Sequence, residues 1–287
     1  GDAPTSVGLG MLPATLHPDP ERVLVVGLGT GQTGGWAAAC PSVERVDAIE
    51  LEPAIFEIAE ACAATSHDAL SDPKVHVHFG DAREWLLATP EAYDVIVSEP
   101  SNPYRAGIAS LFTADFYAGV ADKLAPGGLF VQWVQGYEVS TRTVRTILAT
   151  LHGVFPHVEV WEMRSGGDLL LVASRAPVDH DPARLAARLE TSPYREWLAQ
   201  VTRGEGLVGL YASYVGDTAL VAAEAAEADG RVNTDDRPVI EFDFARQVGD
   251  KSAGFSSAAL RARAAELGAE APPVAAAPAA AALAEAR

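Results

Sequence analysis

A short apolar run, Arg22–Val26, ends abruptly in the glycine-rich segment Gly27–Gly31, and this junction limits the folds open to the chain more than any other segment. The run is nearly free of polar residues, as is typical of a parallel strand buried on both faces. Gly27, Gly29 and Gly31 let the backbone turn tightly and approach a ligand closely. The sequence therefore predicts a strand, a tight turn and a helix, with a ligand at the carboxyl end of the strand.

Short apolar runs and longer helical patterns alternate as far as about Ser174, which is typical of a mostly parallel sheet covered by helices. Further strands are expected at Val46–Leu51, Val75–Phe79, Tyr93–Ser98 and Leu129–Val134, followed by an antiparallel pair at Val158–Glu162 and Asp168–Ser174. Helices are expected from the glycine turn to Cys40, over Pro53–Ala64, from Asp81 to Ala88, over Thr113–Leu124 and over Thr141–Phe155. We therefore predict an α/β fold with a mostly parallel seven-stranded sheet and helices on both faces.

The pattern changes beyond residue 175, and the chain divides into four predicted parts. Residues 1–20 lead into the core and residues 21–175 form it. Residues 176–250 form a mainly helical C-terminal extension with helices Pro182–Leu198 and Thr218–Ala228 and a short strand Val239–Phe244. Residues 251–287 are rich in alanine and proline, so we expect a mobile or weakly helical tail without chemistry. Because the chain begins at Gly1 and becomes apolar almost at once, we expect it to be part of a longer protein.

The charge balance excludes several kinds of partner. The 287 residues include 39 acidic and 21 basic side chains, and the net charge of -18 repels phosphate backbones and anionic lipids while attracting small cations. No run of about eighteen apolar residues and no secretory leader occurs, so we expect no direct membrane insertion by this segment. The 2 cysteines, Cys40 and Cys62, are too few for a disulfide framework or a four-thiolate zinc site. The charge balance therefore predicts no nucleic acid, and it indicates either a small cationic partner or a charge that only keeps the protein soluble.

Two polar pairs invite a metal interpretation, and the sequence favours neither. His76 and His78 share one face of a strand without a third ligand. Asp235 and Asp236 are better explained as a polar corner that pairs with Arg237. We therefore expect no metal.

The residues at the ends of the next two strands favour a nucleoside. Glu50 follows the glycine turn by about twenty residues, where an acid suits the hydroxyls of a ribose. A dinucleotide-binding turn would carry glycine where Gln32 stands, so a nucleoside without a pyrophosphate is favoured. Asp81 would accept a hydrogen bond from an adenine amine or cap a helix, and Ala82 leaves room for the ring. Because these features fall at one edge of the sheet, the sequence predicts an adenosine-shaped site.

The segment after the fourth strand carries the candidate catalytic groups. Its two prolines prevent it from continuing as strand or helix, so we expect a loop. Glu99 would hold a cationic amine and take its proton as the amine attacks an electrophilic carbon, and the alternative role is to brace the loop. Asn102 and Tyr104 in the same loop are candidate partners of the acceptor, and further candidates for substrate binding are Gln132, Gln135 and Tyr137.

These residues resemble those of the spermidine synthases, the polyamine aminopropyltransferases of the Rossmann-like class I methyltransferase superfamily. The resemblance covers about Asp2 to Ser174. It rests on Leu12-Pro13 with His17-Pro18, Val23–Gly31, Glu50-Leu51-Glu52, Gly80-Asp81-Ala82, Asp94–Pro103, Ser110-Leu111-Phe112-Thr113 with Phe116-Tyr117, and Leu124–Gly128. Ser98–Pro103, together with Asn233–Pro238, is similar to bacterial members in which this domain follows a transmembrane portion.

The resemblance implies a nucleoside-binding catalytic domain over residues 21–175 that uses decarboxylated S-adenosylmethionine to alkylate an amine. It assigns Glu50 to the ribose, Asp81 to the adenine and Glu99 to the catalytic base. The other donor-binding residues are then Gly27, Gly29, Thr30, Gly31, Leu51 and Ala82. It further implies a cytoplasmic domain attached to a transmembrane portion of an inner-membrane protein, and a homodimer, which is common in the family.

Three departures from the family pattern leave the function open. The glycine turn of the family usually carries an aspartate that faces the donor's amine, whereas this chain has Thr30. The family's residues for the acceptor amine align with Thr5, Ser6 and Val7, and a second aspartate of the catalytic loop is replaced by Asn102. Three hypotheses follow: an aminopropyltransferase-like enzyme with an acceptor unlike putrescine, a methyltransferase that uses intact S-adenosylmethionine, and a non-catalytic nucleoside-sensing domain of a membrane protein.

Overall fold

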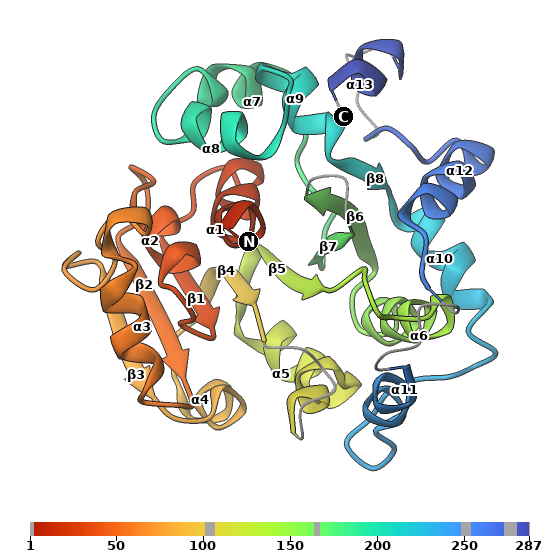
Figure 1. Cartoon of the computed structure of the whole chain (residues 1–287), viewed down its shortest axis with the longest axis horizontal. Helices are drawn as coiled ribbons and strands as arrows, with labels where there is room; N and C mark the ends of the chain where they lie inside the picture. Colours follow the sequence, from red (N-terminus) through yellow and green to blue (C-terminus); the bar gives the residue numbers. More distant parts are fainter. Residues whose placement is uncertain (1–2, 101–106, 164–166, 248–253, 273–279, 287) are drawn as a thin grey trace.

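The computed structural model describes residues 3–100, 107–163, 167–247, 254–272 and 280–286, and these residues build one mixed sheet of eight strands. The strand order is β3-β2-β1-β4-β5-β7-β6-β8 (Figure 1). The strands are β1 Arg22–Val26, β2 Arg45–Glu50, β3 Val75–Phe79, β4 Tyr93–Ser98, β5 Leu124–Val134, β6 His157–Met163, β7 Asp168–Ser174 and β8 Tyr214–Gly216. The α/β prediction is confirmed.

The first five strands pair in parallel, and the last three are joined to the sheet by antiparallel pairs. The chain passes from β1 to β2 and β3 on one side and returns to β4 on the other side of β1. The predicted number of seven strands is wrong. The additional strand, β8, has only three residues and pairs with β6, and so short a run leaves no alternating pattern in the sequence.

Helices cover both faces of the sheet, as predicted. Within the described residues they are α1 Ala3–Leu16, α2 Gln32–Ala38, α3 Ile55–Ala61, η1 Ala63–Thr65, α4 Ala82–Ala88, η2 Ile108–Phe112, α5 Ala114–Lys123, α6 Thr141–His152, α7 Pro182–Leu189, α8 Tyr194–Val201, α9 Gly206–Ala212, α10 Thr218–Ala226, α11 Val239–Gln247, α12 Ser257–Leu267 and α13 Ala280–Ala286. One buried cluster packs α1, α2 and α7–α9 against one face, and a second packs α4–α6, α10 and α12 against the other. Figure 1 shows α7–α9 gathered beside α1, and α11 beside α6.

Helix α1 was not predicted, since the sequence indicates only a lead-in segment over residues 1–20. The helix is buried around almost its whole circumference, and a helix that is apolar on all sides shows no amphipathic period. A Cβ on Gly10 would lie 2.4 Å from the carbonyl oxygen of Thr33. Glycine at this position therefore allows α1 to pack closely on α2.

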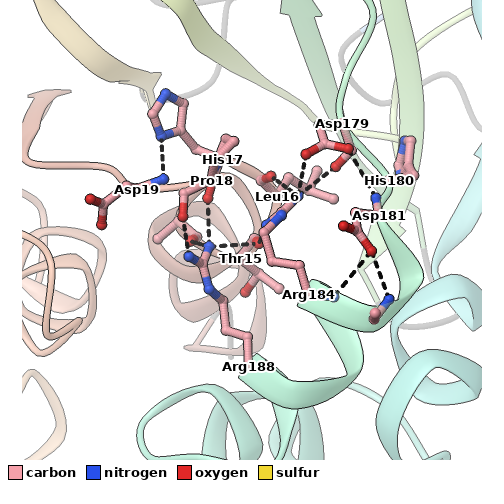
Figure 2. Close-up of polar contacts among 12 residues, drawn as sticks. Thr15, Leu16, His17, Pro18, Asp19, Asp179, His180, Asp181, Arg184 and Arg188 are labelled. Carbon is pink, nitrogen blue, oxygen red and sulfur yellow. Dashed lines mark hydrogen bonds and ion pairs between the residues drawn. The ribbon is translucent and has the colours of Figure 1, made fainter.

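The carboxyl end of α1 is held by two arginines of α7 (Figure 2). Arg184 donates to the carbonyl of Leu16 at 2.9 Å. Arg188 donates to a larger set of carbonyl oxygens, those of Ala14, Thr15, His17 and Pro18. The last turn of α1 contains no basic residue of its own, so the extension supplies the positive charge that the end of this helix favours.

The extension departs from the prediction in two places. Pro182–Leu198, expected as one helix, is divided between α7 and α8. Val239–Phe244, expected as a strand, lies within helix α11. The alternating apolar residues of this segment favour a strand, but Asn233 accepts the backbone N–H of Ile240 at 3.2 Å and so caps the first turn of a helix instead.

The tail forms more packed structure than its composition predicts. Leu260 of α12 and Leu283 of α13 are 5% and 3% exposed, so the expectation of little packing is wrong for these helices, while helix formation itself is confirmed. Among the helices of the described ranges, none combines the length and the apolar character that spanning a bilayer requires. The division of the chain at residues 20, 175 and 250 stays a prediction.

Candidate active site

The candidate site lies at the carboxyl edge of the parallel strands, between β1 and β4. The chain leaves β1 toward one side of the sheet and returns on the other, which is the usual position of a ligand crevice. The backbone N–H of Glu99 donates to the carbonyl of Val26 at 3.1 Å. A Cβ on Gly27 would lie 2.9 Å from the carbonyl oxygen of Glu99. Glycine at position 27 therefore lets the turn after β1 close on the residue that follows β4.

The glycine turn has the backbone conformation that its sequence predicts. Gly27, Gly29 and Gly31 have φ angles of 99°, 52° and 77°, a region that favours glycine. Apart from its chain neighbours, no described atom lies within 4 Å of a Cβ built on Gly29. Thr30 is half-buried within this turn, and Gln32, which is buried, begins α2. Among the described residues, nothing therefore obstructs the approach of a ligand to the backbone at Gly29.

Glu50 is oriented by two backbone amides. Its Oε2 accepts the N–H of Leu28 at 2.9 Å, and its Oε1 accepts the N–H of Glu52 at 2.9 Å. Each carboxylate oxygen has a second lone pair for another donor. Leu51, at the same edge, is 69% exposed and offers an apolar surface. The carboxylate is thus fixed between the glycine turn and the end of β2, where the predicted ribose would lie.

Asp81 caps helix α4. Its Oδ1 accepts the backbone N–H of Arg83 at 2.7 Å, and its side chain is exposed. Gly80 donates its N–H to the carbonyl of Glu50 at 2.9 Å, which joins the ends of β2 and β3. Ala82 is 8% exposed and adds no bulk beyond its methyl group. Because the capping hydrogen bond uses Oδ1, Oδ2 is the oxygen left to accept a hydrogen bond from the predicted adenine amine.

Glu99 is half-buried and its two oxygens have different partners. The hydroxyl of Ser6, from α1, donates to Oε1 at 2.7 Å. The hydroxyl of Thr33, from α2, contacts Oε2 and also lies 3.0 Å from the carbonyl oxygen of Ser6. Helices on the same face of the sheet therefore orient the carboxylate at the end of β4.

The sequence does not identify two residues that contact Glu99, Ser6 and Thr33, or the neighbouring pair Thr5 and Asp168. In the sequence, Ser6 is recognisable only as a departure from the family pattern, and Thr33 gives no signal beyond its position after the glycine turn. Thr5, next to Ser6, donates to Oδ2 of Asp168 at 2.7 Å. Asp168 begins β7, and nothing in the local sequence separates it from an ordinary strand-terminal residue.

The other site residues that the sequence predicts fall into three groups. Asn102 and Tyr104 lie outside the described residues. Gln132 is fully buried and donates its side-chain amide to the carbonyl of Trp133 at 3.0 Å. Like Phe130, two residues earlier in β5, it lies on the face of the sheet that α5 and α6 cover, whereas Glu99 lies on the opposite face. This position gives the predicted substrate contact of Gln132 no support. Gln135 donates to the carbonyl of Tyr137 at 2.9 Å, and Tyr137 is 43% exposed, so these two residues border the edge beyond β5.

One histidine of the β3 pair, His78, contacts a buried carboxylate. Nε2 of His78 lies 2.7 Å from Asp47, which also receives two hydrogen bonds from Arg45 at 2.9 and 2.8 Å. Burial raises the pKa of Asp47, but the hydrogen bonds from Arg45 and His78 outweigh it and hold the pKa below its usual value. No group of three or more His, Cys, Asp or Glu side chains in the described ranges is arranged to hold a metal ion.

The polar corner of the extension pairs differently from the prediction. Asp235 forms its ion pair with Arg83 of α4, not with Arg237. The two partners are 152 residues apart, so local sequence favours the wrong arginine. The corner is therefore attached to the helix that Asp81 caps.

The fold and this edge define a class: a Rossmann-like, methyltransferase-type α/β domain with a candidate nucleoside site at the carboxyl ends of β1–β4. The chain belongs to the spermine/spermidine synthase family, because the sequence profile of the spermine/spermidine synthase domain matches residues 7–163. The predicted resemblance to the spermidine synthases is thereby confirmed.

Known proteins agree with this assignment. The chain is 30% identical over 190 residues to a polyamine aminopropyltransferase of Nitrosomonas europaea, covering 62% of this chain and 57% of that protein. It spans about half the length of the curated relatives that it matches. Its structure is similar to that of a spermidine synthase in complex with the transition-state analogue AdoDATO, with a TM-score of 0.64, 20% identity, and coverage of 79% of this chain and 76% of that one. It is also similar to human methyltransferase-like protein 13 in complex with SAH, with a TM-score of 0.50, 22% identity, and coverage of 66% and 90%. Both structural likenesses show the fold alone.

Proposed function

We propose that this chain transfers an aminopropyl group from decarboxylated S-adenosylmethionine to an amine. The observation that carries the proposal is the environment of Glu99. This carboxylate directly follows β4 of a spermidine synthase domain, and hydroxyls from two helices orient its oxygens. Glu50 and Asp81 lie along the same edge of the sheet, at the ends of β2 and β3.

The donor would bind along the ends of β1–β3. Glu50 would accept hydrogen bonds from the ribose hydroxyls, and Asp81 from the adenine amine. Leu51 and Ala82 would border the adenine ring, and the open backbone at Gly29 would border the chain that carries the sulfonium. These carboxylates and small residues fit a cationic adenosyl donor, because they supply acceptors and leave space without adding positive charge.

In the proposed reaction the amine acts as the nucleophile. Its nitrogen lone pair forms a bond to the propyl carbon attached to the sulfonium, and the carbon–sulfur bond breaks with its electron pair passing to sulfur. Methylthioadenosine leaves, and the nitrogen releases a proton to Glu99. Ser6 and Thr33 contribute by fixing the carboxylate before the amine arrives, so that little reorganisation accompanies the attack.

The acceptor is an amine that differs from putrescine. The first turn of helix α1 carries two hydroxyl side chains, Thr5 and Ser6, at the positions where the family has a tyrosine and an acid. The acidic group near this turn is instead Asp168, which Thr5 contacts. The net charge of -18 favours a cationic acceptor in general.

Thr30 supports the second candidate function, methyl transfer from intact S-adenosylmethionine. The family usually carries an aspartate here, and that carboxylate would repel the donor's own carboxylate. With threonine in the turn, the repulsion is absent and both donors are admissible. Transfer of a methyl group would leave S-adenosylhomocysteine, so the identity of the product separates the two functions.

A comparison of donors tests the proposal. In calorimetric titration with decarboxylated S-adenosylmethionine, S-adenosylmethionine and methylthioadenosine, a tenfold preference for the decarboxylated donor over the intact one, about 1.4 kcal/mol, would support aminopropyl transfer. Preference for the intact donor would favour methyl transfer. Binding without turnover on a broad amine panel would favour the nucleoside-sensing hypothesis, and absence of binding would refute the nucleoside site.

Glu99→Gln provides the matching test of the base. The substitution keeps the size of the side chain and removes its basicity, so turnover should fall at least a hundredfold while affinity for methylthioadenosine changes less than twofold. Retained turnover would refute the assignment of Glu99 as the base.

Three features of the whole protein are proposed from the resemblance alone: a cytoplasmic location, attachment to a transmembrane portion, and a homodimer. Membrane fractionation of the natural protein would test the first two. Light scattering on the purified chain would test the third, with a mass near 30.1 kDa contradicting a dimer.

A further inference from the structure

The corner at residues 233–238, between α10 and α11, attaches the extension to the candidate site. Asn233 is fully buried, and both its backbone and its side chain are engaged. Its side-chain amide donates to the carbonyls of Ala109 and Phe112, at 3.3 and 3.0 Å, in η2. Its backbone carbonyl accepts the N–H of Ala114 at 2.9 Å, and its backbone N–H donates to Thr150 of α6 at 3.0 Å. The corner is therefore fixed against the segment that leads into α5.

Asp235 extends from this fixed corner to α4. Its Oδ1 accepts from Arg83 at 2.9 Å, and its Oδ2 accepts from the other terminal nitrogen of the same guanidinium. Arg83 also donates to the carbonyl of Ser110 at 3.0 Å, and the backbone N–H of Asp235 donates to Asp115 at 2.9 Å. The guanidinium is thus directed toward η2 and the corner by a bidentate pair.

Arg83 is also the residue whose backbone Asp81 caps. The backbone N–H of Arg83 lies 2.7 Å from Oδ1 of Asp81. The side chain of Arg83 therefore starts only two residues along the chain from the carboxylate that is proposed to bind adenine. The guanidinium of a flexible arginine fits a carboxylate in a bidentate ion pair. Such a pair between Arg83 and Asp81 would occupy both oxygens of the Asp81 carboxylate. The contacts with Asp235 and with the carbonyl of Ser110 direct the guanidinium elsewhere, and of the two only Asp235 carries a charge.

We propose that Asp235 is a positioning residue of the donor site: it holds the Arg83 guanidinium away from Asp81 and so keeps the Asp81 carboxylate available for the adenine amine. The inference rests on the proposed adenosyl donor. The hydrogen bond from Arg83 lowers the pKa of Asp235, and Asp235 raises the pKa of Arg83, so both partners are charged at neutral pH.

The experiment compares Asp235→Ala with Asp236→Ala by calorimetric titration with methylthioadenosine. Both substitutions remove one negative charge from adjacent exposed positions, but only the first removes the partner of Arg83. Asp235→Ala should weaken binding about tenfold, and Asp236→Ala should change it less than twofold. Equal effects of the two variants, or unchanged binding in Asp235→Ala, would overturn the proposal.

A double substitution separates positioning from general destabilisation. Arg83→Met removes the competing guanidinium, so Arg83→Met combined with Asp235→Ala should bind methylthioadenosine within twofold of the unaltered chain. In steady-state assays, Asp235→Ala should raise the KM for the donor with little change in kcat. If the double variant binds as weakly as Asp235→Ala, Arg83 does not mediate the effect and the proposal fails. If the unaltered chain does not bind methylthioadenosine, the proposed function fails first, which is a distinct result.

Discussion

Replacing Arg188 with alanine would remove most of the contacts that hold the carboxyl end of α1. The guanidinium donates to four carbonyls between Ala14 and Pro18 and lies 5.3 Å from the ring centre of Tyr194. A hydrogen bond to a charged group contributes about 1.5–3 kcal/mol, and a cation–π contact about 0.5–1 kcal/mol. Because four carbonyls share two terminal nitrogens, and water can reach a half-buried position after truncation, the contributions do not add fully. We expect a loss of about 3 kcal/mol in the free energy of unfolding.

Equilibrium unfolding in urea and thermal unfolding followed by circular dichroism would measure this loss. At about 2–4 °C for each kcal/mol, the melting temperature should fall by about 6–12 °C. Arg195→Ala is the matched control, because Arg195 lies on the neighbouring helix α8 and its side chain is 66% exposed in an ion pair with Glu196. That pair should contribute well under 1 kcal/mol. A shift below about 2 °C for Arg188→Ala, or an equal shift for the control, would refute the conclusion that α7 secures α1.

Three further predictions concern the site and the sheet. Thr33→Val removes the hydroxyl that contacts Glu99, so kcat should fall about tenfold with little change in donor affinity, and an unchanged kcat would contradict the orienting role. Thr30→Asp should weaken binding of intact S-adenosylmethionine at least tenfold relative to the decarboxylated donor, as measured by calorimetry. An unchanged ratio of the two affinities would contradict the proposed repulsion between the two carboxylates. Asp47 has a lowered pKa in the folded state, so its contribution to stability is present above the unfolded pKa of about 3.9 and is lost as pH falls through the folded value. Asp47→Asn should therefore reduce stability at pH 7 and flatten its dependence on pH between about 5 and 3, as urea unfolding would show.

The parts of the candidate site that follow strand ends were predictable from the sequence. Gly27, Glu50 and Asp81 each lie at or just after the end of a predicted strand, and parallel strands bring their carboxyl ends to one edge. The partners of Glu99 were not predictable as such, because Ser6 and Thr33 come from two helices that meet only after packing. Asp235 gives the clearest case, since its charge is obvious in the sequence while its partner, Arg83, is far away along the chain.

The strand positions and most helices of the core were likewise fixed by local patterns, since burial on both faces produces continuous apolar runs and proline or glycine marks their ends. Where local pattern and packing disagreed, packing decided. Val239–Phe244 alternates like a strand, yet the cap from Asn233 makes it helical, and α1 has no polar face because every side is covered. Local sequence thus accounts for the α/β class, the glycine turn and the strand-end carboxylates, because each depends on neighbours along the chain. Tertiary contacts alone determine how Glu99 is oriented, which arginine Asp235 binds and what holds α1, because those partners lie many residues apart and meet only in the folded chain.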